Sequence, residues 1–302
     1  MSFCEDVKTE LVEYTNAGRH CDIAELCALI NICSEILPGG LYFQTENILI
    51  IKKAYALIKK TFGITPYVSA SKKNRNSGRQ YKLIVPNGEV LQKLLSATGT
   101  ANGISSVRAL IVSSVCCKKA YIRGAFLAAA SIANPEKNYH AEFVFQTQDT
   151  ANSVAQLVNY FGLNAKISRY GGNWRVYFKD SDQISDLFKI IEAGGAMLEL
   201  ENIRAFRDMN NDINRKSNFV TANFDKTATS SANQVLDIKL IKERKGLSYL
   251  SEPLRQLAQL RLENTEASLK ELAAMLSPPV SKSGINHRFR KISEIAQEIK
   301  EG

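Results

Sequence analysis

The chain has few of the residues that build metal centres, and it has no long apolar run. Of its 302 residues only three are histidine, and its six cysteines form no C-x-x-C pair. Structural zinc sites usually show such close ligand pairs, so we expect buried, reduced thiols, no metal site and no cofactor. The apolar runs at 48–51 and 125–133 are far shorter than the roughly 20 residues of a membrane-spanning helix. The N-terminus has early acidic residues, unlike a secretory signal, which predicts a cytoplasmic protein with no membrane contact.

Acidic residues are absent between Glu46 and Glu89, although the chain as a whole has a formal charge of +9. The cations in this segment are Lys52, Lys53, Lys59, Lys60, Lys72, Lys73, Arg75, Arg79 and Lys82. Such a segment repels itself unless a polyanion or a well-solvated surface compensates it. We therefore expect a secondary nucleic-acid contact here, at Lys72, Lys73, Arg75 and Arg79, with a solvated face as the alternative.

A second acid-free segment lies between Glu271 and Glu294 and has the pattern of a helix-turn-helix. A short helix is predicted by the apolar positions Leu269, Leu272, Ala273 and Leu276. Pro278 and Pro279 end it, because proline lacks the backbone N–H that would continue the helix. A second helix is predicted by apolar residues spaced four, three, four and three apart, at Ile285, Phe289, Ile292, Ala296 and Ile299.

The second helix carries the side chains that reading a DNA major groove requires. Short polar or forked side chains on its leading face would contact base edges, and cations beside them would contact phosphates. The first group is Ser283, Asn286, His287 and Arg290, and the second is Lys282, Arg288 and Lys291. We expect these seven residues to bind DNA. A solvated basic hairpin in an ordinary helical bundle is the alternative.

The first 200 residues repeat one order of elements after about 100 residues. Two pairs of landmarks mark the repeat: Phe43-Gln44-Thr45 with Phe145-Gln146-Thr147, and Phe62-Gly63-Ile64 with Phe161-Gly162-Leu163. The spacing is that of a domain-sized unit. Apolar runs on both sides of Thr45-Glu46-Asn47 predict a β-hairpin there. The predicted domains are 1–202, with halves of about 1–100 and 110–202, then a polar linker at 203–231 and a helix-turn-helix domain at 232–302.

Each half contains a helix rich in small residues that resembles the LAGLIDADG helix of homing endonucleases. These helices are LCALINICS from Leu26 and IRGAFLAAA from Ile122. The resemblance implies an α+β fold in which Ala28, Gly124 and Ala128 let the two helices approach closely beside two saddle-shaped sheets. Active members of that family have a metal-binding acidic residue where this chain has Cys33 and Ala129. Neither side chain offers the hard oxygen ligand that Mg²⁺ needs, so we expect no cleavage.

The order of these parts in one chain resembles the WhiA family of bacterial regulators. The resemblance includes CCKKAYIRGAFL from Cys116, SIANPEK from Ser131 and the C-terminal helix-turn-helix. It implies a DNA-binding transcription regulator of sporulation or cell division that is not an enzyme. The expected partners are double-stranded DNA and other transcription or cell-division proteins, in the cytoplasm at the nucleoid. The family's second motif helix typically ends in glycines, whereas this chain has Ala129 and Ala130.

Two other functions are compatible with the sequence. A DNA endonuclease could use Glu35, two residues beyond Cys33, with a second carboxylate elsewhere. A scaffold could bind RNA or protein through the acid-free segment from Lys52 to Lys82, with DNA contact secondary.

Overall fold

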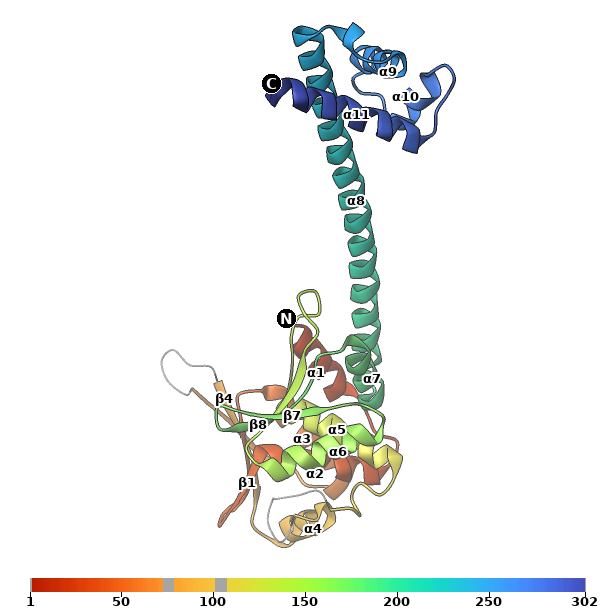
Figure 1. Cartoon of the computed structure of the whole chain (residues 1–302). Coiled ribbons are helices and arrows are strands. Elements are labelled where there is room, and N and C mark those ends of the chain that lie inside the picture. Colours follow the sequence, from red (N-terminus) through yellow and green to blue (C-terminus); the bar gives the residue numbers. More distant parts are fainter. Residues whose placement is uncertain (1, 73–78, 101–107, 302) are drawn as a thin grey trace. The chain divides into compact units, whose positions relative to one another are not determined.

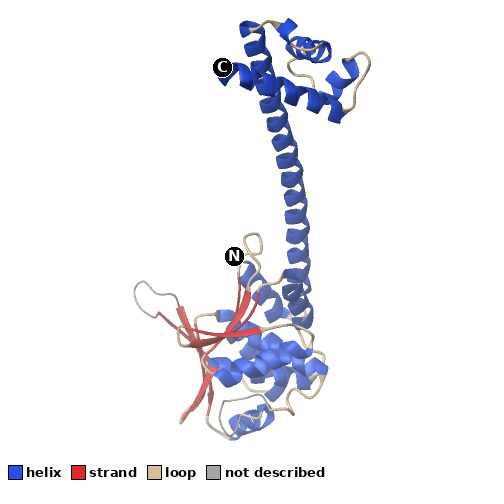
Figure 2. Ribbon diagram, in the orientation of Figure 1, coloured by secondary structure: helices blue, strands red, loops and turns tan. Residues whose placement is uncertain are grey.

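The computed structural model describes residues 2–72, 79–100 and 108–301. The chain forms two compact units, Met1–Arg207 and Asp208–Gly302, which are described separately. Within the described residues every strand belongs to the first unit, and the second unit is helical (Figure 2). The α+β class expected from the sequence is confirmed.

The first half of the N-terminal unit is a four-stranded antiparallel sheet with helices. Its helices are α1 (Phe3–Glu13), α2 (Arg19–Cys33), α3 (Ile48–Phe62) and α4 (Glu89–Thr98). Its strands are β1 (Ser34–Leu37), β2 (Gly40–Thr45), β3 (Tyr67–Lys72) and β4 (Arg79–Pro86). The sheet order is β1-β2-β4-β3, so the hairpins β1-β2 and β3-β4 lie side by side (Figure 1).

The second half repeats this arrangement. Its helices are α5 (Val115–Ala129), α6 (Gln148–Tyr160) and α7 (Ser181–Ile191). Its strands are β5 (Ala130–Ile132), β6 (Ala141–Phe145), β7 (Lys166–Tyr170) and β8 (Asn173–Phe178), in the sheet order β5-β6-β8-β7. The predicted duplication is confirmed, and buried residues of both halves form one hydrophobic core.

One of the two sequence landmarks is out of structural register. Phe43 pairs with Ser34, the residue that follows α2, and the equivalent partner of Ala130 after α5 is Phe143. The equivalent of Phe43 is therefore Phe143 and not Phe145. The second landmark is correct, since Gly63 and Gly162 end α3 and α6 with φ of 71° and 84°. Glycine adopts this left-handed conformation without the steric cost that a Cβ would add.

The predicted hairpin around Thr45-Glu46-Asn47 is wrong, because α3 begins directly after β2. The Asn47 side chain accepts a hydrogen bond from the Leu49 N–H at 2.9 Å and so caps the helix. Buried Ile50, Ile51 and Ala54 lie on its inner face. Isoleucine favours strands only weakly, and its preference depends on its surroundings. Here the Asn47 cap and the burial of one helical face favour a helix instead.

The helix pair α2 and α5 lies at the centre of the N-terminal unit, and small residues let it pack closely. A Cβ atom on Gly124 would lie 2.5 Å from the Glu25 carbonyl oxygen and 2.9 Å from Ala28 Cβ. The Cys33 thiol also reaches the Ala128 carbonyl oxygen, at 3.8 Å. The close approach expected from the LAGLIDADG resemblance is confirmed.

The polar stretch predicted as a linker, residues 203–231, is helical throughout. It belongs to α8 (Gly194–Arg244), which has 51 residues and continues from the first unit into the second. No glycine or proline interrupts residues 203–231, so the backbone hydrogen-bond ladder can continue. Most of its side chains are exposed.

The C-terminal unit packs the end of α8 against four further elements. These are the 3-10 turn η1 (Leu247–Tyr249) and the helices α9 (Glu252–Glu263), α10 (Leu269–Met275) and α11 (Lys282–Glu301). Their apolar faces meet in a separate hydrophobic core that includes Ile238, Leu257, Leu272 and Phe289. The predicted helix-turn-helix is therefore present as α10 and α11.

Candidate nucleic-acid interface

Local capping fixes where both helices of the helix-turn-helix begin. Ser268 and Glu271 form a reciprocal capping box at the start of α10, and the Ser268 N–H donates to the Glu271 carboxylate at 2.8 Å. This hydrogen bond lowers the pKa of Glu271. At the start of α11 the Ser281 hydroxyl accepts from the Gly284 N–H at 3.1 Å. Residues 276–281 form the connection between the two helices.

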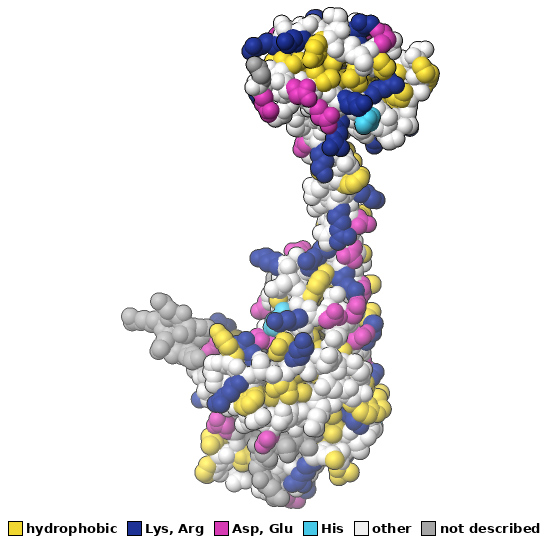
Figure 3. All heavy atoms as spheres, viewed as in Figure 1, with side chains coloured by type: hydrophobic (Ala, Val, Ile, Leu, Met, Phe, Trp, Pro, Cys, Tyr) yellow, Lys and Arg dark blue, Asp and Glu magenta, His cyan; other side chains and the backbone are white. Residues whose placement is uncertain are grey.

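The predicted DNA-contacting residues lie on the surface of α11 that is turned away from the core. Ile285, Phe289, Ile292 and Ala296 are buried. All seven predicted residues lie away from this buried stripe: six are exposed and Arg288 is half-buried. The Ser283 hydroxyl lies 2.9 Å from that of Ser281. Figure 3 shows lysine and arginine side chains among acidic and uncharged ones on the visible face of the C-terminal unit.

Asn286 and Arg290 also line a shallow groove shared with the end of α8. The groove has a volume of about 690 Å³, and its α8 wall runs from Asp225 to Asp237. Ser293 and Asp237 line opposite helices of the groove, and the Ser293 hydroxyl donates a hydrogen bond to the Asp237 carboxylate at 2.7 Å. Arg290 forms an exposed ion pair with Glu294, with Nε and Oε1 3.3 Å apart. The sequence did not indicate that α8 borders Asn286 and Arg290.

Arg261 of α9 is buried against α11, and the sequence did not single it out. It is only 2% exposed. Its Nη1 donates to the Ala267 carbonyl at 2.6 Å, and its guanidinium lies 5.3 Å from the centre of the Phe289 ring. Burial lowers the pKa of Arg261. The residue links the loop after α9 to the buried side of α11.

The nuclease motif positions lie at the C-terminal ends of α2 and α5. Burial raises the pKa of the Cys33 thiol to about 12, and Ala129 offers only a methyl group. Glu35 is exposed on β1, opposite Tyr42. In the described part of the chain, no group of three or more histidine, cysteine or acidic side chains within metal-binding distance includes Cys33 or Glu35.

Two lysines of the acid-free segment are paired with carboxylates of α2. The sequence did not reveal these pairs. Lys53 is 3% exposed, and its Nζ lies 3.2 Å from Glu25 of α2. Lys60 pairs with Asp22 of the same helix at 2.8 Å. Burial lowers the pKa of Lys53, and the Glu25 carboxylate opposes that shift. Both lysines are therefore already paired with a carboxylate, Lys53 in the interior and Lys60 at the surface, and neither needs a polyanion to compensate it.

The proposed secondary contact lies on the β3-β4 hairpin. Lys72 and Arg79 are exposed and directly opposite each other in the strand register. Lys73 and Arg75 lie outside the described residues.

A buried polar network joins the middle of α2 to the middle of α5, and the sequence did not reveal it either. Arg123 of α5 is 1% exposed, and its Nε lies 3.4 Å from Glu25. The same guanidinium donates to the Asn16 side chain and to Glu192. The carboxylates of Glu25 and Glu192 thus compensate the cations of Lys53 and Arg123 within the N-terminal unit. Such partners come from distant segments and have no local sequence signal.

No helix in the described ranges is long and apolar enough to cross a membrane.

Family comparisons match both parts of the chain. The family described as the WhiA C-terminal HTH domain matches residues 213–296, and the WhiA LAGLIDADG-like domain matches residues 118–210. A protein of Alkaliphilus oremlandii, named probable cell division protein WhiA, is 41% identical over 316 residues, which cover 100% of this chain and 99% of that protein. A protein of the same name from Clostridium perfringens is 40% identical over 314 residues, which cover 100% and 99%.

Solved structures agree with these sequence matches. Full-length DUF199/WhiA from Thermatoga maritima has a TM-score of 0.62 and 26% identity, covering 99% of each chain. The N-terminal LAGLIDADG domain of DUF199/WhiA has a TM-score of 0.52 and 20% identity, covers 63% of this chain and 90% of that chain, and shows the shared fold. With relatives about 40% identical over the full length of both chains, this chain belongs to the WhiA family.

Proposed function

We propose that this protein is a sequence-specific DNA-binding transcriptional regulator that acts in cell division or sporulation. The observation that carries the proposal is the exposed side of α11, where polar side chains and cations lie together on a helix that follows a helix-turn-helix connection. A helix of this kind enters the DNA major groove with such a face. The name of its relatives, probable cell division protein, supports the process.

The seven residues divide into two roles. Asn286 and Arg290 read base edges, with Ser283 and His287 beside them. Lys282, Arg288 and Lys291 contact phosphates and fix the register of the protein on the duplex. The exposed Arg290–Glu294 pair does not prevent base contact, because surface ion pairs contribute only about 0–1 kcal/mol.

The N-terminal unit is a nuclease-like scaffold without cleavage activity. A thiol at Cys33 and a methyl group at Ala129 cannot hold Mg²⁺ or position an attacking water. Incubation of supercoiled plasmid with the protein and Mg²⁺ tests this. Cleavage that disappears in Glu35→Gln would contradict the scaffold assignment and favour the endonuclease.

The β3-β4 hairpin adds a secondary nucleic-acid contact through Lys72 and Arg79, together with Lys73 and Arg75. The remaining expected partners are other transcription or cell-division proteins, and the protein works at the nucleoid in the cytoplasm. We infer that DNA binding depends mainly on α11. Replacement of Lys72 and Arg79 by alanine should lower affinity less than the loss of Asn286 and Arg290. The reverse order would favour a scaffold that binds RNA or protein through the basic segment.

The decisive experiment measures fluorescence anisotropy with DNA from the upstream region of the protein's own gene and with random DNA, from about 50 to about 200 mM salt. Asn286→Ala should cost about 1–3 kcal/mol on specific DNA and little on random DNA. Lys291→Ala should weaken binding to both DNAs alike and reduce the salt slope by about one. Lys300→Ala, an exposed cation at the far end of α11, is the matched control. Equal effects of Asn286→Ala on both DNAs would refute base reading.

A further inference from the structure

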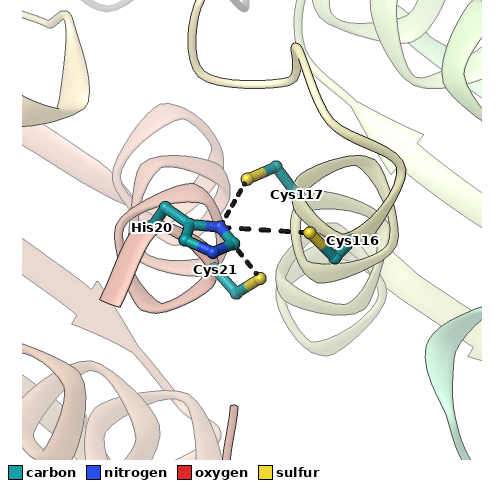
Figure 4. Close-up of side chains that lie close together, drawn as sticks. All are labelled: His20, Cys21, Cys116 and Cys117. Atoms are coloured by element: carbon teal, nitrogen blue, oxygen red, sulfur yellow. Dashed lines mark hydrogen bonds between the residues drawn. The ribbon is translucent and has the colours of Figure 1, made fainter. Parts of the chain in front are cut away.

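Two adjacent pairs of potential ligands meet at the N-terminal ends of the central helices. His20 and Cys21 lie in the first turn of α2, and Cys116 and Cys117 lie in the first turn of α5 (Figure 4). The ligand atoms of all four residues lie within 4.8 Å of one another. Within the described ranges this is the only group of three or more such side chains. The LAGLIDADG motif positions lie at the opposite ends of these helices.

The distances fit a tetrahedral metal site. His20 Nδ1 lies 3.1 Å from Cys117 Sγ, 3.3 Å from Cys21 Sγ and 4.0 Å from Cys116 Sγ. Zinc with bonds of about 2.3 Å to sulfur and 2.0–2.1 Å to nitrogen holds neighbouring ligand atoms about 3.5–3.8 Å apart. The observed separations lie on both sides of this range, so small side-chain adjustments place all four ligands around one ion.

The surroundings favour this arrangement of side chains. A Cβ on Gly18 would lie 2.7 Å from Nε2 of the His20 ring, so glycine leaves the space that the ring occupies. The Ser114 hydroxyl lies 3.2 Å from Cys116 Sγ and also caps α5, which places a polar partner beside one sulfur. Such outer partners orient metal ligands. Cys21 and Cys117 pack against Ala24 and Ala120, whose small side chains leave the sulfurs close together.

We propose that His20, Cys21, Cys116 and Cys117 form a structural Zn²⁺ site that joins the two halves of the N-terminal unit. Three thiolates and one imidazole are a closed zinc ligand set with no position left for a substrate. Zinc binding releases the three thiol protons and links residues that lie 96 and 97 positions apart. The site departs from the expectation that the chain binds no metal, and it is independent of the DNA-binding function.

Metal analysis of full-length, tag-free protein purified under reducing conditions tests the proposal. We expect about one zinc ion per chain, and a tetrahedral thiolate spectrum when Co²⁺ replaces it. Cys116→Ser changes an exposed residue, so the fold should survive. Loss of a residue that only hydrogen-bonds a metal ligand typically lowers metal affinity 10- to 100-fold. Cys116→Ser removes a ligand itself, so it should lower zinc affinity by at least this much. Cys4→Ser, the same change outside the cluster, is the matched control and should keep its zinc.

Three outcomes would overturn the site. One is wild-type protein that contains no zinc and fails to compete with a chromophoric chelator for added Zn²⁺. Another is equal zinc content in folded Cys116→Ser and Cys4→Ser. A third is a zinc-free protein in which mass spectrometry finds a disulfide between the α2 and α5 cysteines. Circular dichroism of each variant establishes that it is folded, and the zinc content of the wild type is informative without any variant.

Discussion

Replacement of Gly124 by alanine tests whether close packing of α2 against α5 holds the N-terminal unit together. The added Cβ would lie 2.5 Å from the Glu25 carbonyl oxygen, a backbone atom that cannot rotate away. Overpacking of this kind costs about 1–3 kcal/mol, and a rigid neighbour favours the upper end. Alanine has a higher helix propensity than glycine, and this difference offsets about 1 kcal/mol of that cost. We therefore expect a net loss of about 2 kcal/mol in the free energy of unfolding.

The single tryptophan, Trp174 on β8, makes this loss measurable in the N-terminal unit alone. Urea unfolding followed by its fluorescence should show a folding equilibrium constant about 30-fold lower in Gly124→Ala than in the wild type. Gly194→Ala is the matched control, because a Cβ there has no heavy atom within 4 Å. It should be neutral or slightly stabilising. A Gly124→Ala protein as stable as the wild type would refute the close-packing argument.

Two further predictions concern charged groups. Lys53→Met removes one cation from Glu25, which keeps Arg123, and takes the donor from the Leu11 and Tyr14 carbonyls, so it should cost about 1–3 kcal/mol. Lys52→Met, on the exposed side of α3, should stay within about 0.5 kcal/mol. A similar effect of both changes on urea unfolding would contradict the burial argument. The hydrogen bond from the Ser268 N–H lowers the pKa of Glu271 in the folded protein. The ionised Glu271 carboxylate therefore stabilises the fold at pH values above its unfolded pKa of 4.5, and this stabilisation is lost as the pH falls through its folded pKa. Hydrogen exchange of α10 should show this loss in the wild type and not in Glu271→Gln.

Helix ends and buried helical faces could be predicted, because residues close together in the sequence specify them. The duplication could be inferred from Gly63 and Gly162, because a left-handed glycine ends the same helix in each half. The periodic apolar residues of α11 placed the predicted DNA-contacting face correctly away from the core. Caps, glycine turns and helical periodicity act over a few residues, so they can be read without knowing the fold. The hairpin predicted around Thr45-Glu46-Asn47 failed because a strand-like isoleucine run is also compatible with a buried helical face.

The sequence by itself determined the duplicated α+β unit, the helix-turn-helix and the cations on the exposed side of its second helix. Only the tertiary structure decided that Lys53 is buried against Glu25, that α8 borders Asn286 and Arg290, and that His20-Cys21 meets Cys116-Cys117. The physical reason is distance along the chain. Each of these contacts joins segments that come together only when helices pack, so no spacing within either segment reveals its partner.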